Sequence, residues 1–162
     1  MVTRFQRDSR RDAQMENPVI RECEPEDVEA VHQLDLDWES EGVTYGFGPS
    51  SPDEIREALG PYLLVAVAAD EIIGYSRGEV HVSRDLCVFE EGEQHLEIYD
   101  LYVREPYRSA GIGGKLVERM KEVAGRNGIR RFRVHSATMD LDRVLKFYRN
   151  HGFKTWCLEM FI

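Results

Sequence analysis

The sequence predicts an α/β fold in which helices cover both faces of one mixed β-sheet. Apolar residues alternate in some segments and recur every three or four residues in others, which indicates strands and helices in the order β-α-α-β-β-β-α-β-α-β. The chain has 162 residues, of which 42% are apolar, and this is enough for one domain with its own core.

The first part of the chain combines a tail, a strand and two helices. Residues 1–17 mix Arg and Asp with little apolar periodicity, so we expect a mobile tail before a single domain of residues 18–162. Residues 19–23 have the pattern of a strand, and Pro25 opens the first helical pattern. Residues 51–60 predict a short helix with a serine as its N-cap.

The middle of the chain has the pattern of three strands joined by turns. Residues 62–70 and 71–83 are expected to pair as a hairpin whose turn lies about Asp70 and Glu71. A polar turn then leads into HLEIYDLYV at 95–103, which predicts the next strand.

The last part of the chain returns to alternating helices and strands. A helical face begins at Ile112 and is closed by Gly128, and residues 129–137 alternate as a strand. A helix over 141–151 and a closing strand over 153–162 complete the order.

Charge and composition limit the classes of partner. The 21 basic and 30 acidic residues give a net charge of −9, which disfavours nucleic acid and favours a cationic substrate. The longest apolar stretch, 62–69, is too short to span a bilayer, so we expect a soluble protein with no membrane partner. The three cysteines form no C-x-x-C pair and the five histidines show no metal spacing. We therefore expect no metal and a cytoplasmic location.

The segment YRSAGIGGKL, residues 107–116, places three glycines and two cations between a strand and a helix. Glycine lets backbone approach a ligand, and a helix that begins there presents unpaired N–H donors, so the segment predicts a pyrophosphate site. The expected donors are consecutive amides, those of Gly111, Ile112, Gly113 and Gly114, with Arg108 and Lys115 adding charge. The alternative is a glycine-rich turn with no ligand.

Two common phosphate loops do not fit this spacing. A Walker loop needs glycine where Ser109 stands and a hydroxyl where Leu116 stands. A dinucleotide loop counted from Gly111 needs its last glycine at position 116 as well. Sites for ATP or nicotinamide are therefore disfavoured.

Two motifs resemble the GNAT superfamily of acyl-CoA-dependent N-acetyltransferases. The family's R/Q-x-x-G-x-G/A pattern has its counterpart in RSAGIG at 108–113, and its second signature, an aromatic pair followed by Gly-Phe, in FYRNHGF at 147–153. The resemblance implies a mixed, mostly antiparallel sheet splayed between its fourth and fifth strands. It also implies acetyl-CoA as the cosubstrate, with pantetheine paired to the end of the strand before the loop. The residues expected to bind it are Leu101, Tyr102, Val103, Arg108, Ser109, Gly111, Ile112, Gly113, Gly114 and Lys115.

The sequence departs from the family pattern at two places. Leu141 stands where many members carry Asn, and only residues 154–162 follow the Gly-Phe pair, where most members have two strands. One closing strand leaves a sheet edge that a second copy can fill, so a homodimer is expected.

Glu97 and Asp100 are the candidates for the proton acceptor that amine acetylation needs. A lysine-like amine has a pKa of about 10.4 and must lose a proton at neutral pH. The two carboxylates lie three residues apart, so they face opposite sides of a regular strand, and a β-bulge, which the resemblance implies, brings them to one side. Alternatively, one points to solvent and the other pairs with Arg131 or Arg133.

Tyr148 shares a helical face with Leu141, Val144 and Leu145, which is typical of a core tyrosine. The resemblance implies another role, because the family's tyrosine at this place often protonates the departing CoA thiolate.

The run DLDWESEGVTYGF, residues 35–47, sets four acids beside three aromatic residues. It is either a pocket for a cationic acceptor or a solvated helix face with loop anchors. No motif marks Ser109 or Ser136 as a nucleophile, so direct transfer in a ternary complex is expected. The sequence thus predicts an N-acetyltransferase that acts on a primary amine of a small molecule or peptide. The alternative is a non-catalytic acyl-CoA-binding module on the same fold.

Overall fold

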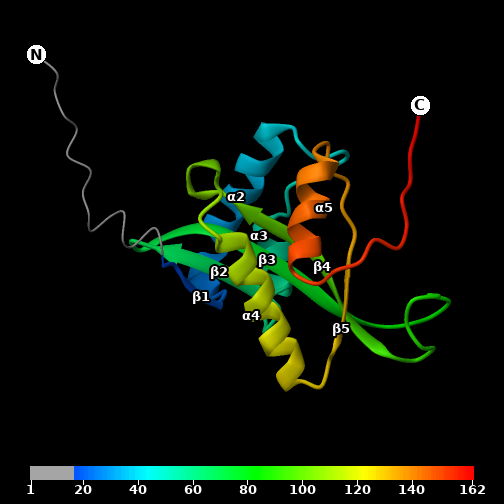
Figure 1. The fold of residues 1–162 in the computed structure, drawn as a ribbon. Coiled ribbons are helices and arrows are strands. Elements are labelled where there is room, and N and C mark those ends of the chain that lie inside the picture. The colour runs from blue at the N-terminus through cyan, green and yellow to red at the C-terminus, as the bar shows by residue number, and fades with distance from the viewer. Residues whose placement is uncertain (1–16) are drawn as a thin grey trace, which may run out of the picture.

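The computed structural model describes residues 17–162 and shows a five-stranded mixed sheet in the order β1-β2-β3-β4-β5 (Figure 1). The strands are β1 (Val19–Glu22), β2 (Leu63–Ala68), β3 (Glu71–Val82), β4 (Gln94–Val103) and β5 (Arg131–Val134). The helices are α2 (Val28–Glu41), α3 (Pro52–Glu57), α4 (Ile112–Arg126) and α5 (Leu141–Asn150), with short 3-10 turns η1 (Pro25–Asp27) and η2 (Glu105–Tyr107). Apart from residue 17, the predicted tail lies outside the described residues.

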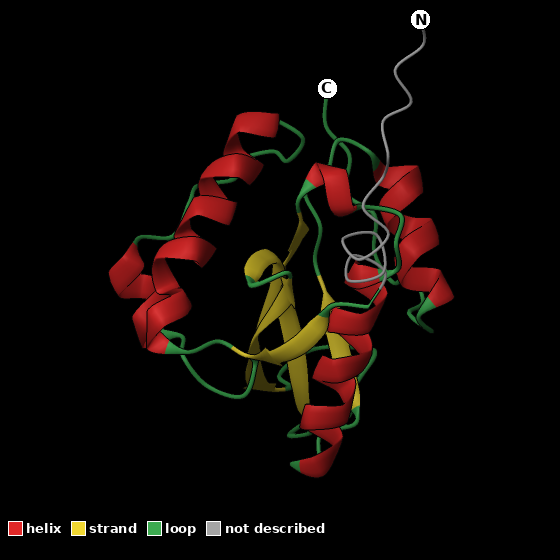
Figure 2. Ribbon diagram, turned by 90° about the vertical axis from the view of Figure 1, so that its left-hand side faces the viewer, coloured by secondary structure: helices red, strands yellow, loops and turns green. Residues whose placement is uncertain are grey.

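Helices lie on both sides of the sheet, as Figure 2 shows, and this arrangement confirms the predicted fold class. Successive residues of β2 point to opposite faces, so Leu64 joins the core beneath α4 while Leu63 joins the core beneath α2. Leu116 and Met120 of α4 fill the first core, and Leu34 of α2 fills the second.

The sheet is antiparallel from β1 to β4, and β5 is parallel to β4. This last pairing is short, because His95–Ile98 of β4 lies beside the whole of β5 and the pairing stops at Val134. From Tyr99 to Val103, β3 is the sole strand partner of β4 among the described residues. The sheet is therefore splayed between its fourth and fifth strands, as expected.

Local signals set several element ends where the sequence predicted them. The Ser51 hydroxyl accepts from the Glu54 N–H at 3.3 Å, and the Glu54 carboxylate accepts from the Ser51 N–H at 2.7 Å, which makes a capping box. The β2–β3 turn consists of Ala69 and Asp70, with φ of 51° and 62°, one residue earlier than predicted. Two positive φ values in succession are typical of a tight hairpin turn.

Two predicted strands differ from the structure. β5 covers Arg131–Val134 rather than 129–137, because the chain leaves the sheet after Val134 and Thr138 forms a bridge with Thr44. The closing strand over 153–162 is wrong: the segment is irregular, and in Figure 1 its red end runs away from the sheet. A strand needs a hydrogen-bonding neighbour, and among residues 17–162 none lies beside this segment.

Within residues 17–162, no helix combines the length and the apolar character needed to cross a bilayer.

Candidate active site

A cleft of about 1070 Å³ opens where β4 and β5 separate. Its walls are the end of β4, the start of α4, one face of α5, and two loop segments, 43–47 and 135–138. The volume is at the upper end of the range usual for small-molecule sites. The cleft therefore has room for a large cosubstrate and an acceptor together.

The glycine segment forms the floor of this cleft at the start of α4. Gly111 adopts a φ of 79° as the N-cap, and Ser109 before it has a φ of 66°. The first bond within the helix runs from the Lys115 N–H to the Gly111 carbonyl at 3.1 Å. The amides of the first turn therefore have no acceptor inside the helix, and they line the cleft with the positive end of the helix dipole.

One of the glycines, Gly114, also lets α4 and the end of α5 pack closely. A Cβ placed on Gly114 would lie 2.9 Å from Cε1 of His151, which is too close, and one on Gly113 would lie 3.5 Å from the Phe147 ring. The bare backbone at Gly114 therefore serves helix packing, in addition to the access for an anion that the sequence predicts. Sequence reasoning missed the first purpose, because the contact joins residues more than thirty positions apart.

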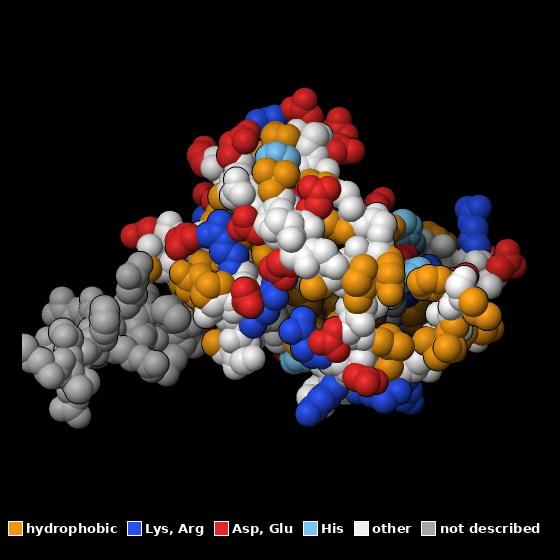
Figure 3. Space-filling model, turned by 90° about the horizontal axis from the view of Figure 1, so that it is seen from above, with side chains coloured by type: hydrophobic (Ala, Val, Ile, Leu, Met, Phe, Trp, Pro, Cys, Tyr) orange, Lys and Arg blue, Asp and Glu red, His pale blue; other side chains and the backbone are white. Residues whose placement is uncertain are grey.

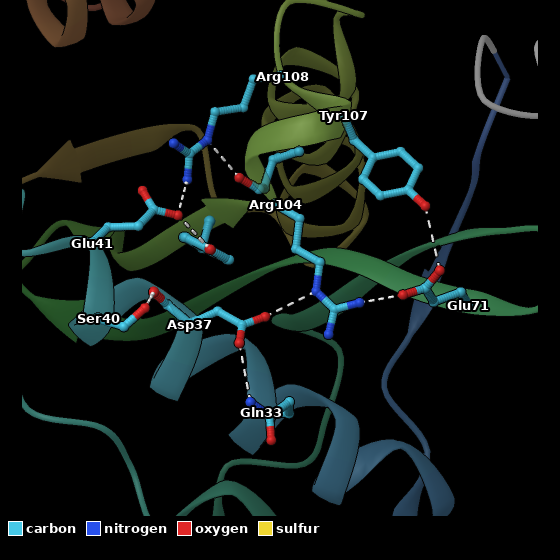
Figure 4. Close-up of polar contacts among 10 residues, drawn as sticks. Gln33, Asp37, Ser40, Glu41, Glu71, Arg104, Tyr107 and Arg108 are labelled. Atoms are coloured by element: carbon cyan, nitrogen blue, oxygen red, sulfur yellow. Dashed lines mark hydrogen bonds and ion pairs between the residues drawn. The ribbon is translucent and has the colours of Figure 1, made fainter.

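Arg108 is held by the protein at the edge of the cleft (Figure 4). Its Nη2 lies 2.7 Å from Glu41 Oε1, and its Nε donates to the Val103 carbonyl at 2.7 Å. Tyr102 donates its hydroxyl to the same Glu41 oxygen at 2.7 Å. The Glu41 carboxylate thus connects the end of α2 to the end of β4 and to the glycine segment.

The structure agrees in part with each interpretation of the run 35–47, because its aromatic residues line the cleft and Trp38 anchors the following loop by stacking on Phe47. Asp37 pairs with Arg104 at 3.0 Å, and Figure 4 shows that Arg104 lies between Asp37 and Glu71 and binds both. Glu41 binds Arg108, as above, and Asp35 is buried. Three of the four acids therefore tie α2 to other elements, and Glu39 alone of them is exposed.

The remaining predicted cosubstrate residues also lie at the cleft. Leu101, Tyr102 and Val103 line it from the part of β4 that has no β5 neighbour. Lys115 lines it from α4, and its Nζ donates to Asn17 Oδ1 at 3.0 Å.

The predicted bulge is present in β4. Arg77 lies opposite Asp100 and Gly78 lies opposite Ile98, so Tyr99 is the extra residue. Ile98 points into the core beneath α4, which turns Glu97 toward the α2 face.

After the bulge, the alternation of β4 side chains between the two faces of the sheet is reversed. Tyr102 packs into the core beneath α2, so Asp100 shares that face with it and with Glu97. Both carboxylates line the cleft, and they lie on one side of the strand because of the single extra residue.

Each carboxylate has an arginine partner, and neither points freely into solvent. Asp100 pairs with Arg77 Nε at 2.7 Å, and Glu97 pairs with Arg133 at 3.2 Å, with exposed fractions of 13% and 12% for the two acidic side chains. The expected pairing of one acid with Arg133 is thus found for Glu97. Burial raises the pKa of Asp100, although the Arg77 charge opposes this.

Sequence reasoning did not identify Arg77. A signal for it exists: Arg77 is a lone cation on the strand that precedes HLEIYDLYV, and antiparallel pairing of the two strands brings it opposite Asp100.

Tyr148 faces the cleft from α5, and it is not fully buried. Its ring contacts those of Phe147 and Phe153 edge to face, with centroids 5.0 Å and 5.3 Å away. Among the described residues, its hydroxyl has no hydrogen-bond partner. Burial and then the negative charge of Asp100 raise its pKa, so the phenol stays protonated at neutral pH.

Two segments of the cleft wall, 43–47 and 135–138, are held together by backbone contacts, and the sequence marked the first of them as part of the run 35–47 but did not indicate their pairing. The Tyr45 N–H donates to the Ala137 carbonyl at 2.8 Å and the Met139 N–H donates to the Val43 carbonyl at 2.9 Å. The ring of Tyr45 also meets Phe161 of the C-terminal segment at 5.4 Å. This pairing joins residues about ninety positions apart, so local patterns give no sign of it.

Within the described residues, no three His, Cys, Asp or Glu side chains gather as metal ligands.

A family model described as the acetyltransferase (GNAT) family matches residues 28–153. This range includes both candidate carboxylates, the glycine segment and Tyr148.

Solved structures share the fold. An aminoglycoside acetyltransferase from an uncultured soil metagenomic sample, in complex with trehalose, has a TM-score of 0.68 and 21% identity over 90% of this chain and 95% of its own. An aminoglycoside N-acetyltransferase in complex with CoA has a TM-score of 0.71 and 15% identity over 90% of this chain and 93% of its own. A predicted acetyltransferase with acetyl-CoA from Clostridium acetobutylicum has a TM-score of 0.67 and 16% identity over 89% and 96%.

Proposed function

The chain belongs to the acetyltransferase (GNAT) family, and on this premise we propose that it transfers an acetyl group from acetyl-CoA to a primary amine. One observation carries the proposal. A single cleft brings the open amides of α4 together with a buried carboxylate and an unbonded phenol, which are the three parts that direct acetyl transfer needs.

The cosubstrate is proposed to lie along the splayed edge of β4. Its pyrophosphate meets the amides of the first turn of α4, where the helix dipole favours negative charge. Its pantetheine arm follows the backbone of Leu101–Val103, which has no β5 neighbour. The solved relatives that hold CoA or acetyl-CoA support this choice of cosubstrate.

Asp100 is proposed as the base. The acceptor's ammonium N–H bond breaks and an O–H bond forms on the carboxylate, which frees the nitrogen lone pair to attack the thioester carbonyl. A carboxylate with a raised pKa takes this proton more readily than an ordinary one. Glu97 lines the same cleft, where it pairs with Arg133, and it is the alternative base.

Tyr148 is proposed as the acid. When the tetrahedral adduct collapses, the C–S bond breaks, the thiolate takes the phenol proton, and the resulting phenolate takes the second proton of the acceptor nitrogen, while Asp100 releases its proton to solvent. The raised pKa of Tyr148 keeps the phenol protonated at neutral pH before the reaction and makes its phenolate a ready acceptor for the nitrogen's proton. No covalent acetyl-enzyme is needed, so transfer takes place in a ternary complex.

The acceptor is proposed to be a cationic small molecule or a peptide amine. The solved relatives named as aminoglycoside acetyltransferases support a small polycationic amine. The net charge of −9 favours the approach of such a cation.

We also propose a homodimer, formed through the C-terminal segment and the outer edge of β5. Several large apolar side chains of the segment are exposed: Trp156, Leu158, Met160, Phe161 and Ile162. Figure 3 shows hydrophobic side chains gathered at the right of the view, the side on which this segment lies in Figure 1. The outer edge of β5 has no strand partner in the described part of the chain, so a second copy can pair with it.

Thiol release from acetyl-CoA across a panel of amines tests the function. The panel contains sisomicin, a polyamine and a lysine peptide, and the Asp100→Asn and Tyr148→Phe variants are measured beside the parent. We expect release with at least one amine and a large loss in both variants. Tight binding of acetyl-CoA with no thiol release for any amine would instead support the acyl-CoA-binding module.

A further inference from the structure

A buried polar cluster lies behind Asp100, on the side of the sheet covered by α2. Asp35 of α2 and Tyr75 of β3 are each 2% exposed, and the Tyr75 hydroxyl donates to Asp35. The second oxygen of Asp35 accepts from the Ser50 N–H at 2.9 Å. Both oxygens of this carboxylate therefore have a donor, and Asp35 is held in one orientation.

Asp35 and Asp100 line the same narrow pocket. Apolar side chains of Val31, Ile55 and Leu63 complete its walls, and it leaves no room for a water molecule. Charges on the two carboxylates therefore interact through a medium of low dielectric constant, with little screening by solvent.

One guanidinium, that of Arg77, lines this pocket. Arg77 pairs with Asp100 at 2.7 Å, and its Nη1 lies 3.4 Å from the Ser50 hydroxyl. The pocket is thus lined by two carboxylates and one guanidinium, and this guanidinium pairs with Asp100.

We propose that Asp35 is a positioning residue for acetyl transfer, held by Tyr75 and Ser50 so that its charge faces Asp100 and makes Asp100 the proton acceptor for the amine. This inference rests on the proposed function, in which Asp100 is the base. It adds a residue on α2 that touches neither the cosubstrate nor the acceptor.

The groups that face Asp100 act in opposite directions on its pKa. Burial raises it most, the Arg77 charge and hydrogen bond lower it, and the Asp35 charge raises it. Tyr148 approaches from α5 with a neutral phenol. Glu97 lies on the same face of β4 but is neutralised by Arg133. Removal of the Asp35 charge therefore lowers the pKa of Asp100 and makes it a weaker base.

The contacts of Asp35 with Tyr75 and Ser50 also fit a purely structural role. In that role, Asp35 only anchors α2 to β3. Loss of the carboxylate would then lower stability and leave the titration of Asp100 unchanged. The two roles are separated by a titration of Asp100 itself.

The test is a carboxyl ¹³C NMR titration of the full chain, with the Asp100 signal assigned by its loss in Asp100→Asn. We expect Asp35→Asn to lower the titration midpoint of Asp100 by about one pH unit, a typical effect of one nearby like charge. Tyr75→Phe keeps the buried ring and removes the donor to Asp35. Without this donor Asp35 is no longer held facing Asp100, so the midpoint of Asp100 falls in this variant too.

Asp37→Asn is the matched control, because Asp37 lies on the same helix but pairs with Arg104 rather than facing Asp100. It should leave the midpoint unchanged. An unchanged midpoint in folded Asp35→Asn or Tyr75→Phe overturns the inference.

Failure of the proposed function is a separate outcome. If Asp100→Asn keeps the parental kcat/KM with the amine found in the panel, Asp100 is not the base, whatever the titration shows. If Asp100→Asn is inactive while Asp35→Asn leaves the midpoint unchanged, the base assignment stands and the role of Asp35 fails.

Discussion

At the scale of single residues, Tyr148 combines partial burial with a hydroxyl that no described residue binds. Tyr148→Phe keeps the ring contacts with Phe147 and Phe153 and removes only the hydroxyl. We expect kcat to fall on the order of 10²-fold with little change in KM, because the proton is needed only as the C–S bond breaks. Steady-state kinetics beside a melting curve measures both effects. A parental kcat with a lowered Tm would indicate that Tyr148 contributes to packing and not to proton transfer.

The second prediction at this scale concerns pH. Protonated Asp100 cannot accept the amine's proton, so kcat/KM should fall as pH decreases through its raised pKa. Asp100→Asn should remove this acid limb and lower kcat/KM by roughly 10²- to 10⁴-fold. Glu97→Gln is measured separately, because Glu97 lies in the same cleft. If both variants keep the parental rate and acid limb, neither carboxylate takes part in the proton transfer.

At the scale of secondary-structure elements, the first turn of α4 is the proposed site of the cosubstrate's pyrophosphate. A Cβ on Gly113 meets the Phe147 ring at an ordinary contact distance of 3.5 Å, so Gly113→Glu can fold while placing a negative charge at the amides. We expect the affinity for acetyl-CoA to fall by about tenfold or more, since like charges then meet where the helix dipole favoured an anion. Isothermal titration calorimetry measures this loss.

Gly125→Glu is the control for that experiment. It adds the same charge near the other end of α4, where a Cβ meets nothing within 4 Å and the cleft is absent. Its affinity should match the parent. Equal affinities for both variants would contradict the assignment of the pyrophosphate to this turn.

At the scale of the whole molecule, the proposed dimer depends on the exposed C-terminal segment. Leu158 is 60% exposed and Met160 is 80% exposed, which is unusual for neighbouring apolar residues of one segment. We expect the parent to be a dimer in light scattering, and the double change Leu158→Glu with Met160→Glu to shift it to a monomer, because burial of the two charges is costly. A parent that stays monomeric at every concentration contradicts the proposed dimer.

The sequence by itself determined the features that depend on neighbouring residues. Helical periodicity located α4, and Ser51 with Glu54 defined the start of α3, because both signals act within one or two helical turns. The glycine segment indicated its own turn, since Gly111 must adopt a positive φ and the amides after it precede the first helical bond.

Tertiary structure alone decided the features that join distant parts of the chain. The sequence alone left the bulge at Tyr99 as one of two alternatives. In the structure this bulge places Glu97 and Asp100 on the same face of β4. The pairing of Asp100 with Arg77, and the approach of Asp35 from α2, depend on strand register and helix packing. The C-terminal segment shows the same limit: its apolar residues predicted a strand, but a strand forms only where another backbone lies beside it, and no local pattern encodes that neighbour.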